Sequence, residues 1–285
     1  MSGYSTVSSL NKLFANIYED AVFAVREQTI ATRLVTTFTD GRGDQTRTIS
    51  EYPSVSFQAV AETEDYANPT EFKKTSLSTL TPGEYMAQFI LTDRRLETDP
   101  QDARRDAALE LGYGAADKVD SDVLGNIANL TGGTVGASGT AMIWGYLFAA
   151  ISRLRQAKVP RPYYAVLAPY HWHDLATAVT PAATTATNAP QFQDEVMRRW
   201  YVGNVAGLDG IFVSANVPVS GTDAYSAVFN PRAIAYDLRR DFRLEPERDA
   251  SARAYELNAT MLYAHGVWRP KWGVAIKADN SAPES

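Results

Sequence analysis

The chain contains, at residues 99–130, the stretch DPQDARRDAALELGYGAADKVDSDVLGNIANL, on which the interpretation of the fold depends. Asp99 and Pro100 are typical of a helix start, because aspartate caps free N–H groups and proline fits the first helical position. Small or apolar residues then recur every fourth position, which predicts one helix with a single buried ridge formed by Ala103, Ala107, Leu111, Ala115, Val119, Val123 and Ile127. The opposite, exposed face is assigned Asp102, Asp106, Asp117 and Asp120.

Such a helix would be about 45–50 Å long at about 1.5 Å per residue. That length exceeds the usual globular range and is typical of a structural spar rather than an active-site element. We therefore expect the helix to organise the elements around it.

The residues before this helix predict an amphipathic helix (11–25), a strand (29–38) and a long hairpin (46–80). The hairpin has few large apolar residues, and an isolated hairpin is only marginally stable in water. It must therefore lie on the main body or on a neighbouring molecule. Residues 85–91 (YMAQFIL) are apolar on both faces apart from Gln88, which indicates a buried strand.

The residues after the helix predict a mixed half of helices and short strands. A flexible loop is expected at 131–139. Helices are expected at 140–158, 169–179 and 191–201, and strands at 163–168, 210–215, 224–229, 233–237, 253–264 and 272–277. The order of elements favours an α+β fold over a doubly wound sheet.

The composition excludes several classes of protein. The chain has 285 residues, no cysteine and a net charge of −6. Disulfide scaffolds and thiolate metal sites are thereby excluded, and a dedicated nucleic-acid binder would usually carry a basic face. No apolar run reaches the roughly 20 residues that cross a bilayer, and the first residues do not resemble a secretory signal.

Few side chains suggest chemistry. His171 and His173, with Asp174, could begin a metal site, and a metal-dependent hydrolase is one alternative interpretation. In a helix, however, the two histidines point about 200° apart and cannot converge on one ion. The glycine-rich loop 132–136 lacks the lysine of a phosphate loop. The charged residues between Arg239 and Arg253 favour an ion-paired strand surface over a DNA site. We predict no catalytic residue, no metal and no cofactor.

Seven stretches, taken in order, resemble one family. They are NKLFANIYEDAVFAVRE (11–27), the hairpin 46–80, LTPGEYMAQFILTDRRLETDPQDARRD (80–106), YYAVLAPYHWHDLATAV (163–179), RRWYVGNVAGLDGIFVSANVP (198–218), AVFNPRAIAYDLRRDFRLEPERD (227–249) and LYAHGVWRPKWGVAIKAD (262–279). Together they resemble the major capsid proteins of tailed double-stranded DNA bacteriophages, which have the Hong Kong 97-type fold.

The resemblance implies an α+β fold in four parts. These are an N-terminal arm (1–40), an extended hairpin called the E-loop (41–80), a peripheral domain (81–136 and 236–265) with the spine helix 99–130, and an axial domain (137–235 and 266–285). It implies a structural protein without catalysis that self-assembles into pentamers and hexamers. These form an icosahedral head shell in the virion, built in the host cytoplasm, that encloses double-stranded DNA without sequence-specific binding.

The resemblance also implies partners and contact residues. A portal, a separate scaffolding protein and, in some relatives, a decoration protein are expected, and no membrane. The expected inter-subunit contacts are Phe14 and Ile17 in the arm, Phe57, Glu64, Asp65, Phe72, Lys73 and Lys74 in the E-loop, and Arg94 and Arg95 before the spine helix.

Two alternatives stay open within the same fold. One is an encapsulin-type nanocompartment shell, which encloses cargo enzymes instead of a genome. The other concerns reinforcement, since some relatives crosslink an E-loop lysine to a neighbour's asparagine with help from a glutamate. Lys73 or Lys74 would then meet Asn258 and Glu256, although a plain ion pair between Lys73 or Lys74 and an acidic residue across the interface is the simpler expectation.

Overall fold

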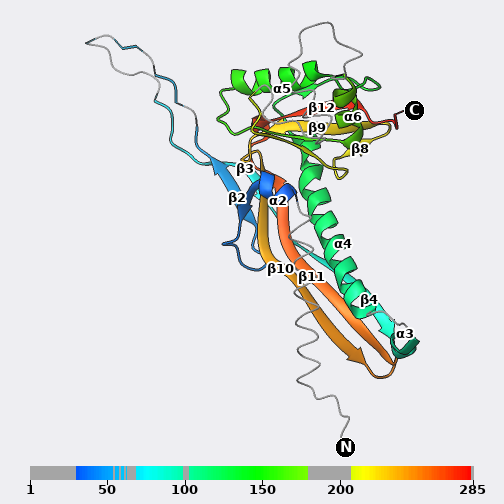
Figure 1. Ribbon diagram of the computed structural model, residues 1–285. Helices are drawn as coiled ribbons and strands as arrows, with labels where there is room; N and C mark the ends of the chain where they lie inside the picture. The colour runs from blue at the N-terminus through cyan, green and yellow to red at the C-terminus, as the bar shows by residue number, and fades with distance from the viewer. Residues whose placement is uncertain are drawn as a thin grey trace, which may run out of the picture.

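The computed structural model describes residues 30–283 except 54, 58, 61, 63–68, 99–102 and 179–206 (Figure 1). Several expectations fall outside these residues. They include the helices predicted at 11–25 and 191–201 and the contact residues Phe14, Ile17, Glu64 and Asp65. Within the described residues, no helix is long and apolar enough to cross a membrane.

The long helix α4 (Ala103–Gly125) lies along a four-stranded sheet, and a 3₁₀ turn, η1 (Asn126–Asn129), continues it (Figure 1). The strand order is β1 (Thr36–Phe38), β10 (Ile234–Asp249), β11 (Ala254–Val267) and β4 (Gly83–Thr92). β1 runs parallel to β10, and the other pairs are antiparallel. The short helix α3 (Asp93–Thr98) follows β4 at the far end of this elongated part.

The second sheet lies at the other end of α4. Its order is β5 (Thr134–Val135), β12 (Gly273–Asp279), β9 (Asp223–Phe229), β6 (Tyr164–Leu167) and β7 (Gly210–Val213), with β8 (Val219–Ser220) paired to β9. Helices α5 (Trp144–Gln156) and α6 (Pro169–Thr177) pack on it, and a 3₁₀ turn, η3 (Pro270–Trp272), leads into β12.

A third, two-stranded sheet forms the start of the hairpin. β2 (Arg47–Glu51) pairs antiparallel with β3 (Thr75–Leu80), from Arg47 opposite Leu80 to Glu51 opposite Thr75. The described residues beyond these strands continue away from the rest of the molecule (Figure 1). This hairpin is therefore a projection and not a layer of the core.

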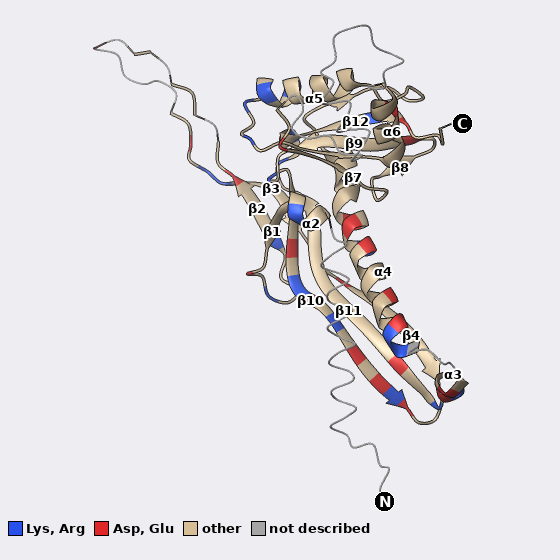
Figure 2. Ribbon diagram, viewed as in Figure 1, with Lys and Arg blue, Asp and Glu red and all other residues tan. Residues whose placement is uncertain are grey.

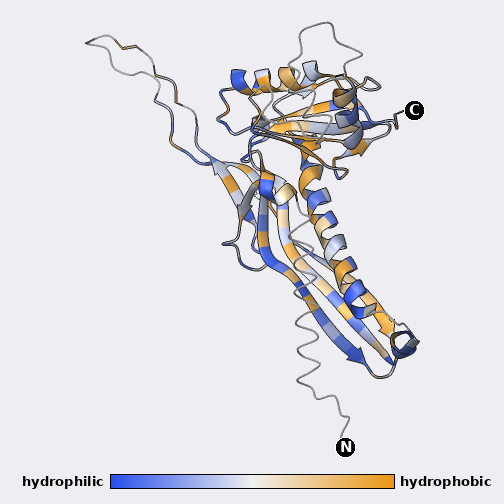
Figure 3. Ribbon diagram, viewed as in Figure 1, coloured by the Kyte–Doolittle hydropathy of each residue, from blue (hydrophilic) through white to orange (hydrophobic). Residues whose placement is uncertain are grey.

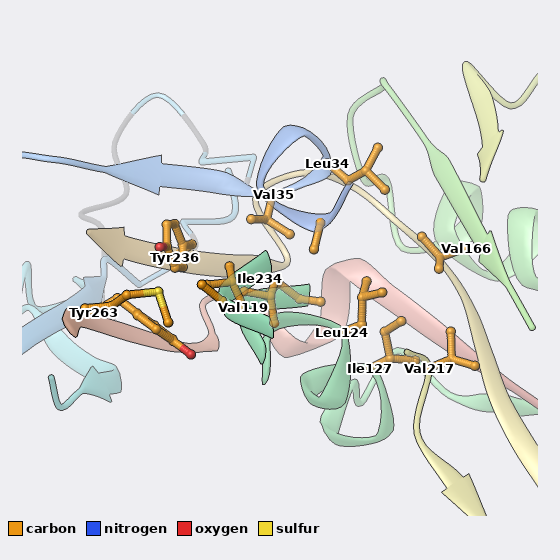
Figure 4. Close-up of a cluster of buried hydrophobic side chains, with 14 of the residues drawn as sticks. Leu34, Val35, Val119, Leu124, Ile127, Val166, Val217, Ile234, Tyr236 and Tyr263 are labelled. Atoms are coloured by element: carbon orange, nitrogen blue, oxygen red, sulfur yellow. The ribbon is translucent and has the colours of Figure 1, made fainter. Parts of the chain in front are cut away.

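The predicted ridge of α4 is buried along its described length. Val123 and its neighbour Leu124 are fully buried, as is Ile127 in η1. Figure 4 shows Val119, Leu124 and Ile127 packed among side chains from both sheets, including Ile234 and Val166. One continuous core thus joins the two sheets through the helix.

The alternation of side chains in the second sheet separates this core from another one. In β6, Val166 faces the core around α4, which we call the spine core. Ala165 and Leu167 face a second core under α5 and α6. In β9, Phe229 likewise faces the spine core and Val228 faces the second core. Because side chains alternate along a strand, one sheet serves both cores.

Three sequence predictions need correction. The segment 29–38 was predicted as one strand, but it contains the short helix α2 (Ala31–Leu34) before β1. The loop predicted at 131–139 includes β5, which pairs with β12. Asp120 was assigned to the exposed face of the long helix, and it is buried.

Asp120 is buried because its carboxylate accepts hydrogen bonds from the backbone N–H groups of Ile30 and Ala31, both at 3.0 Å. These N–H groups lie at the start of α2, where no backbone acceptor is available within the helix. Burial raises the pKa of Asp120 in spite of the two hydrogen bonds. The residue therefore attaches α2 to the spine helix.

We predict that Ile127→Ala lowers the free energy of unfolding by about 2–5 kcal/mol, because it leaves a cavity in a fully buried position. The matched control Ile143→Ala removes the same atoms from a side chain that is 50% exposed and should cost less than about 1 kcal/mol. Denaturant unfolding of the unassembled chain, followed by circular dichroism, measures both. Equal losses would contradict the placement of the spine core.

Candidate assembly surfaces

The E-loop exposes apolar side chains that no part of the described chain covers. Phe57 is 100% exposed and Phe72 is 77% exposed, while Tyr52, Val55 and Val60 are about half exposed. Tyr52 and Phe72 stack with ring centroids 4.7 Å apart, and the Lys74 ammonium lies 5.6 Å from the Tyr52 ring. Lys73 and Lys74 are both exposed. The hairpin therefore presents an apolar surface bordered by two positive charges.

The root of this hairpin is firmly packed. Ile49 of β2 and Leu80 of β3 are buried against Ala235 of β10 and Ala264 of β11. Gly266 lies against Leu80, whose Cδ2 would be 2.6 Å from an added Cβ, so a larger residue there would displace the end of the leucine side chain. Phe38 and Trp268 pack on the edge of the cluster with ring centroids 5.5 Å apart. The projection thus begins from a fixed base.

Asp237 is a polar centre at the same root. It is fully buried, and its Oδ2 accepts Nε–H of Arg47 at 2.8 Å and an Nη2–H of Arg239 at 2.7 Å. Arg47 also donates to Asp40 and lies 4.5 Å from the Phe38 ring. The hydrogen bond from Arg47 lowers the pKa of Asp40. Arg47 of β2 therefore connects this strand to Asp237 of β10 and to Asp40 in the turn that precedes β2.

A second apolar surface follows β4. This strand was predicted to be buried, but it is the edge strand of its sheet, paired on one side only, with β11. Met86, Phe89 and Ile90 are exposed, the first by 62% and the last by 57%. Hydrophobic colour recurs along this strand in Figure 3. The prediction of burial was wrong for the single chain.

Two cavities lie between β4 and α4. One, of about 380 Å³, is lined by Phe89, Ile90, Leu91, Arg95, Asp106, Ala107 and Glu110. The other, of about 190 Å³, is lined mainly by apolar residues of β4, α4 and β11, including Tyr85, Met86 and Met261. We call these two cavities together the β4 groove. Its lining is mostly apolar, and its charged residues are Asp106, Glu110, Arg95 and Lys118.

The two arginines of α3 differ in their surroundings. Arg95 lines the β4 groove, whereas Arg94 is exposed outside it. Next to them, Asp93 accepts two N–H groups of Arg248, each at 2.7 Å, and the Arg248 guanidinium lies 4.6 Å from the Tyr255 ring.

The prediction of an ion-paired surface on β10 is confirmed for three arginines: Arg240, Arg243 and Arg248 pair with Glu84, Glu245 and Asp93. Arg239 is also paired, with Asp237, but this pair is buried. Figure 2 shows both signs of charge alternating along β10.

The candidate metal residues have structural roles instead. His171 is fully buried, with Nδ1 2.6 Å from the Ser226 hydroxyl and Nε2 3.2 Å from the Ala278 carbonyl. Asp174 accepts the backbone N–H of Met142 at 3.0 Å. Across the described residues, no group of three or more potential ligands could hold a metal ion. The histidine pair therefore gives no support to the hydrolase alternative.

Comparison with known sequences identifies the family. The sequence model of the phage capsid protein family matches residues 78–276. The chain belongs to the phage capsid protein family. As a member of this family it is a structural capsid protein rather than an enzyme, and its place is the virion capsid. No curated protein matches its sequence.

Solved capsids share the fold at low sequence identity. The capsid of cyanophage P-SCSP1u is 18% identical with a TM-score of 0.65, and 87% of each chain is covered. Mycobacterium phage Che8 gives 17% identity and a TM-score of 0.68, covering 87% of this chain and 90% of that one. A virus-like particle from Pyrococcus furiosus gives 12% identity and a TM-score of 0.59, with 92% and 98% covered.

Sequence reasoning missed the β4 groove and the arginines at the E-loop root. The exposed residues Phe57, Phe72, Lys73 and Lys74 all belong to the projecting hairpin, whereas Arg94 and Arg95 belong to α3 at the far end of the first sheet. A strand with apolar residues on both faces could have signalled the groove, since an edge strand that meets a partner has the same pattern.

We predict that the free energy of unfolding of this capsid protein falls at acid pH because of His171. Burial lowers the pKa of His171 below its usual 6.5, so the unfolded chain takes up the proton first. With respect to His171, the folded state keeps its full stability above pH 6.5. It loses stability as the pH falls from 6.5 towards the lower pKa that His171 has in the folded chain. His171→Gln should be less stable at about pH 7 but lose less stability between about pH 6.5 and pH 5.

Thermal unfolding of the unassembled chain across this pH range tests the prediction. His173→Gln, which removes a histidine two residues further along α6 whose side chain is 38% exposed, is the control. Burial also lowers the pKa of His265, so part of the slope should persist in His171→Gln. An unchanged slope in His171→Gln would contradict the assignment.

Proposed function

We propose that this chain forms pentamers and hexamers that close into an icosahedral phage head around double-stranded DNA, and that the E-loop of one copy lies in the β4 groove of a second copy. The observation that carries the proposal is the pair of uncovered apolar surfaces, one on the projecting hairpin and one along an edge strand. Exposed apolar patches bordered by charge are typical of protein–protein interfaces.

The hairpin needs a second copy because its own body lies behind it. Its apolar residues between Tyr52 and Phe72 continue outward from a root that Ile49 and Leu80 hold against β10 and β11 (Figure 1). Burying such side chains contributes roughly 1.5–3 kcal/mol each. In a closed shell every copy makes the contact, so modest contacts sum to a stable particle.

Two carboxylates of the groove could pair with the E-loop lysines, although Arg95 and Lys118 also line it. Lys73 and Lys74 lie at the base of the apolar part of the E-loop, and Asp106 and Glu110 line the groove. Opposite charges across an interface fix the register and raise the rate of encounter. This pairing favours non-covalent contact over a lysine–asparagine crosslink. Glu256, moreover, already accepts a hydrogen bond from Gln88 within the same chain at 2.9 Å.

The remaining partners follow from the family and form part of the proposal. The shell would be assembled in the host cytoplasm with a portal and a separate scaffolding protein, and a decoration protein can bind its surface. The net charge of −6 disfavours tight binding of the packaged DNA. The encapsulin alternative differs only in content, so extracted particles should yield DNA and no enriched cargo enzyme.

We predict that wild-type protein forms shells or rings of capsomers in negative-stain electron microscopy and that Lys73→Glu with Lys74→Glu forms neither. The double variant should remain folded, because both side chains are exposed and support no core. Adding Asp106→Lys and Glu110→Lys restores opposite charges and should restore assembly. Normal shells from Lys73→Glu with Lys74→Glu would contradict the proposed contact, and a wild type that never assembles with its scaffold would contradict the function.

We also predict that Phe57→Ser and Ile90→Ser each impair assembly and leave subunit stability within about 0.5 kcal/mol of wild type. Both side chains are exposed in the free chain, so their loss removes apolar area only from the interface. Val219→Ser, 57% exposed on β8, is the control. Light scattering during assembly, with thermal unfolding alongside, separates the two effects. Unimpaired assembly of both variants would exclude the β4 groove as the binding site of the E-loop.

A further inference from the structure

An arginine-lined cavity lies at the root of the E-loop, separate from the β4 groove. It has a volume of about 330 Å³ and is lined by Asp40, Gly41, Arg42, Gln45, Thr46, Arg47 and Arg239. The turn before β2 supplies most of the lining, and β10 supplies Arg239. Neither the packing of the subunit nor the proposed groove contact accounts for this cavity.

The residues that line the cavity carry a net positive charge. Asp40 lines it, and Asp237 lies behind it and binds both Arg47 and Arg239. Three arginines and one aspartate line it, whereas Asp237 behind it and Asp44 in the same turn balance the charge of the wider surroundings. The Arg42 side chain is exposed. The cavity is therefore a local positive site on an acidic protein.

Arg239 has unused hydrogen-bonding capacity. Its side chain is only 3% exposed, and it donates to Asp237 at 2.7 Å and to the Arg42 carbonyl at 3.2 Å. Its Nε–H has no hydrogen-bond partner among the described residues. A buried donor without an acceptor is costly, but this atom is buried from solvent, so a ligand in the cavity meets the exposed Arg42 guanidinium first.

The position of Arg239 is fixed by its surroundings. A Cβ on Gly41 would lie 2.1 Å from the guanidinium carbon of Arg239, so the turn approaches that group as closely as glycine allows. The guanidinium is thus held between the turn and β10. A preorganised guanidinium binds a carboxylate with less loss of entropy than a mobile one.

We propose that this cavity binds a carboxylate side chain from the acidic stretch of a second copy's E-loop, residues 51–71. That stretch has five acidic residues, Glu51, Glu62, Glu64, Asp65 and Glu71, and no lysine or arginine. The described part of the same hairpin projects away from its own body, so its charges meet other molecules (Figure 2). The inference rests on the proposed shell assembly and adds a polar contact to it.

Arg42→Glu is the test variant, because Arg42 is exposed and its contact to Arg239 is made by the backbone carbonyl, which the substitution keeps. We expect the variant to unfold at the wild-type temperature and to need at least about tenfold more protein to assemble, since it places like charges together. Lys271→Glu makes the same charge change at an exposed lysine of η3 and should assemble as the wild type does.

A charge swap identifies the occupant. In the Arg42→Glu background, each of the five acidic residues is changed to lysine in turn, and one of the five should bring assembly back to the wild-type concentration. Restoration by none of them would overturn the proposal. So would an Arg42→Glu variant that assembles normally, even if its particles retained less DNA, because that loss would assign the cavity to phosphate groups.

The salt dependence gives a second readout. The gap between wild type and Arg42→Glu should narrow as sodium chloride is raised from about 0.05 M to about 0.5 M, because salt screens a partly exposed pair. A gap that does not change with salt would argue for a local folding defect instead. Wild-type assembly in these experiments tests the proposed function separately, so failure of the cavity contact alone leaves the function standing.

Discussion

The burial of one face of α4 between two sheets is the interaction on which the rest of the structure depends. The ridge from Ala107 to Ile127 covers the first sheet, and Ile127 and Leu130 continue the same core to β6 and β9 of the second. Each fully buried aliphatic side chain contributes roughly 1.5–3 kcal/mol. Because the core is continuous, the two sheets are held together as parts of one molecule. Everything that projects from it begins at a defined position.

Polar contacts determine where the helix rests on the sheet, which apolar packing alone would leave less specific. Asp122 of α4 accepts the Tyr263 hydroxyl of β11 at 2.7 Å and the Lys118 ammonium at the same distance. One turn later, Asn126 lies 2.9 Å from Nδ1 of His265. Burial, followed by the neighbouring carboxylate, raises the pKa of Tyr263, so its hydroxyl remains a donor to Asp122. These contacts at the end of α4 fix its register on β11.

The sequence predicted what depends on period and composition. The four-residue spacing located the buried ridge. The shortage of large apolar residues showed that the hairpin has no core of its own, but it left open whether the main body or a neighbour supports it. Asp120 was misplaced because helical spacing cannot show that the N–H groups of Ile30 and Ala31 approach it across about 90 residues of chain. β4 was called buried because an apolar strand has the same pattern whether its own chain or another copy covers it. The arginine cavity depends on the tertiary meeting of Arg239 with the turn at Gly41, for which no sequence spacing gives a sign.

The arrangement separates folding from assembly. The residues that hold the hairpin, Ile49, Leu80 and Asp237, lie at its root and belong to the body, whereas its exposed apolar residues lie beyond Glu51 and contribute nothing to the subunit's cores. A subunit can therefore fold completely while these exposed side chains stay in water. In the proposed shell each E-loop contact is individually modest, so an incorrectly placed copy can dissociate before the shell closes, and closure then sums the contacts. A larger apolar core in the hairpin would strengthen each contact, but it would also favour association before the geometry is correct.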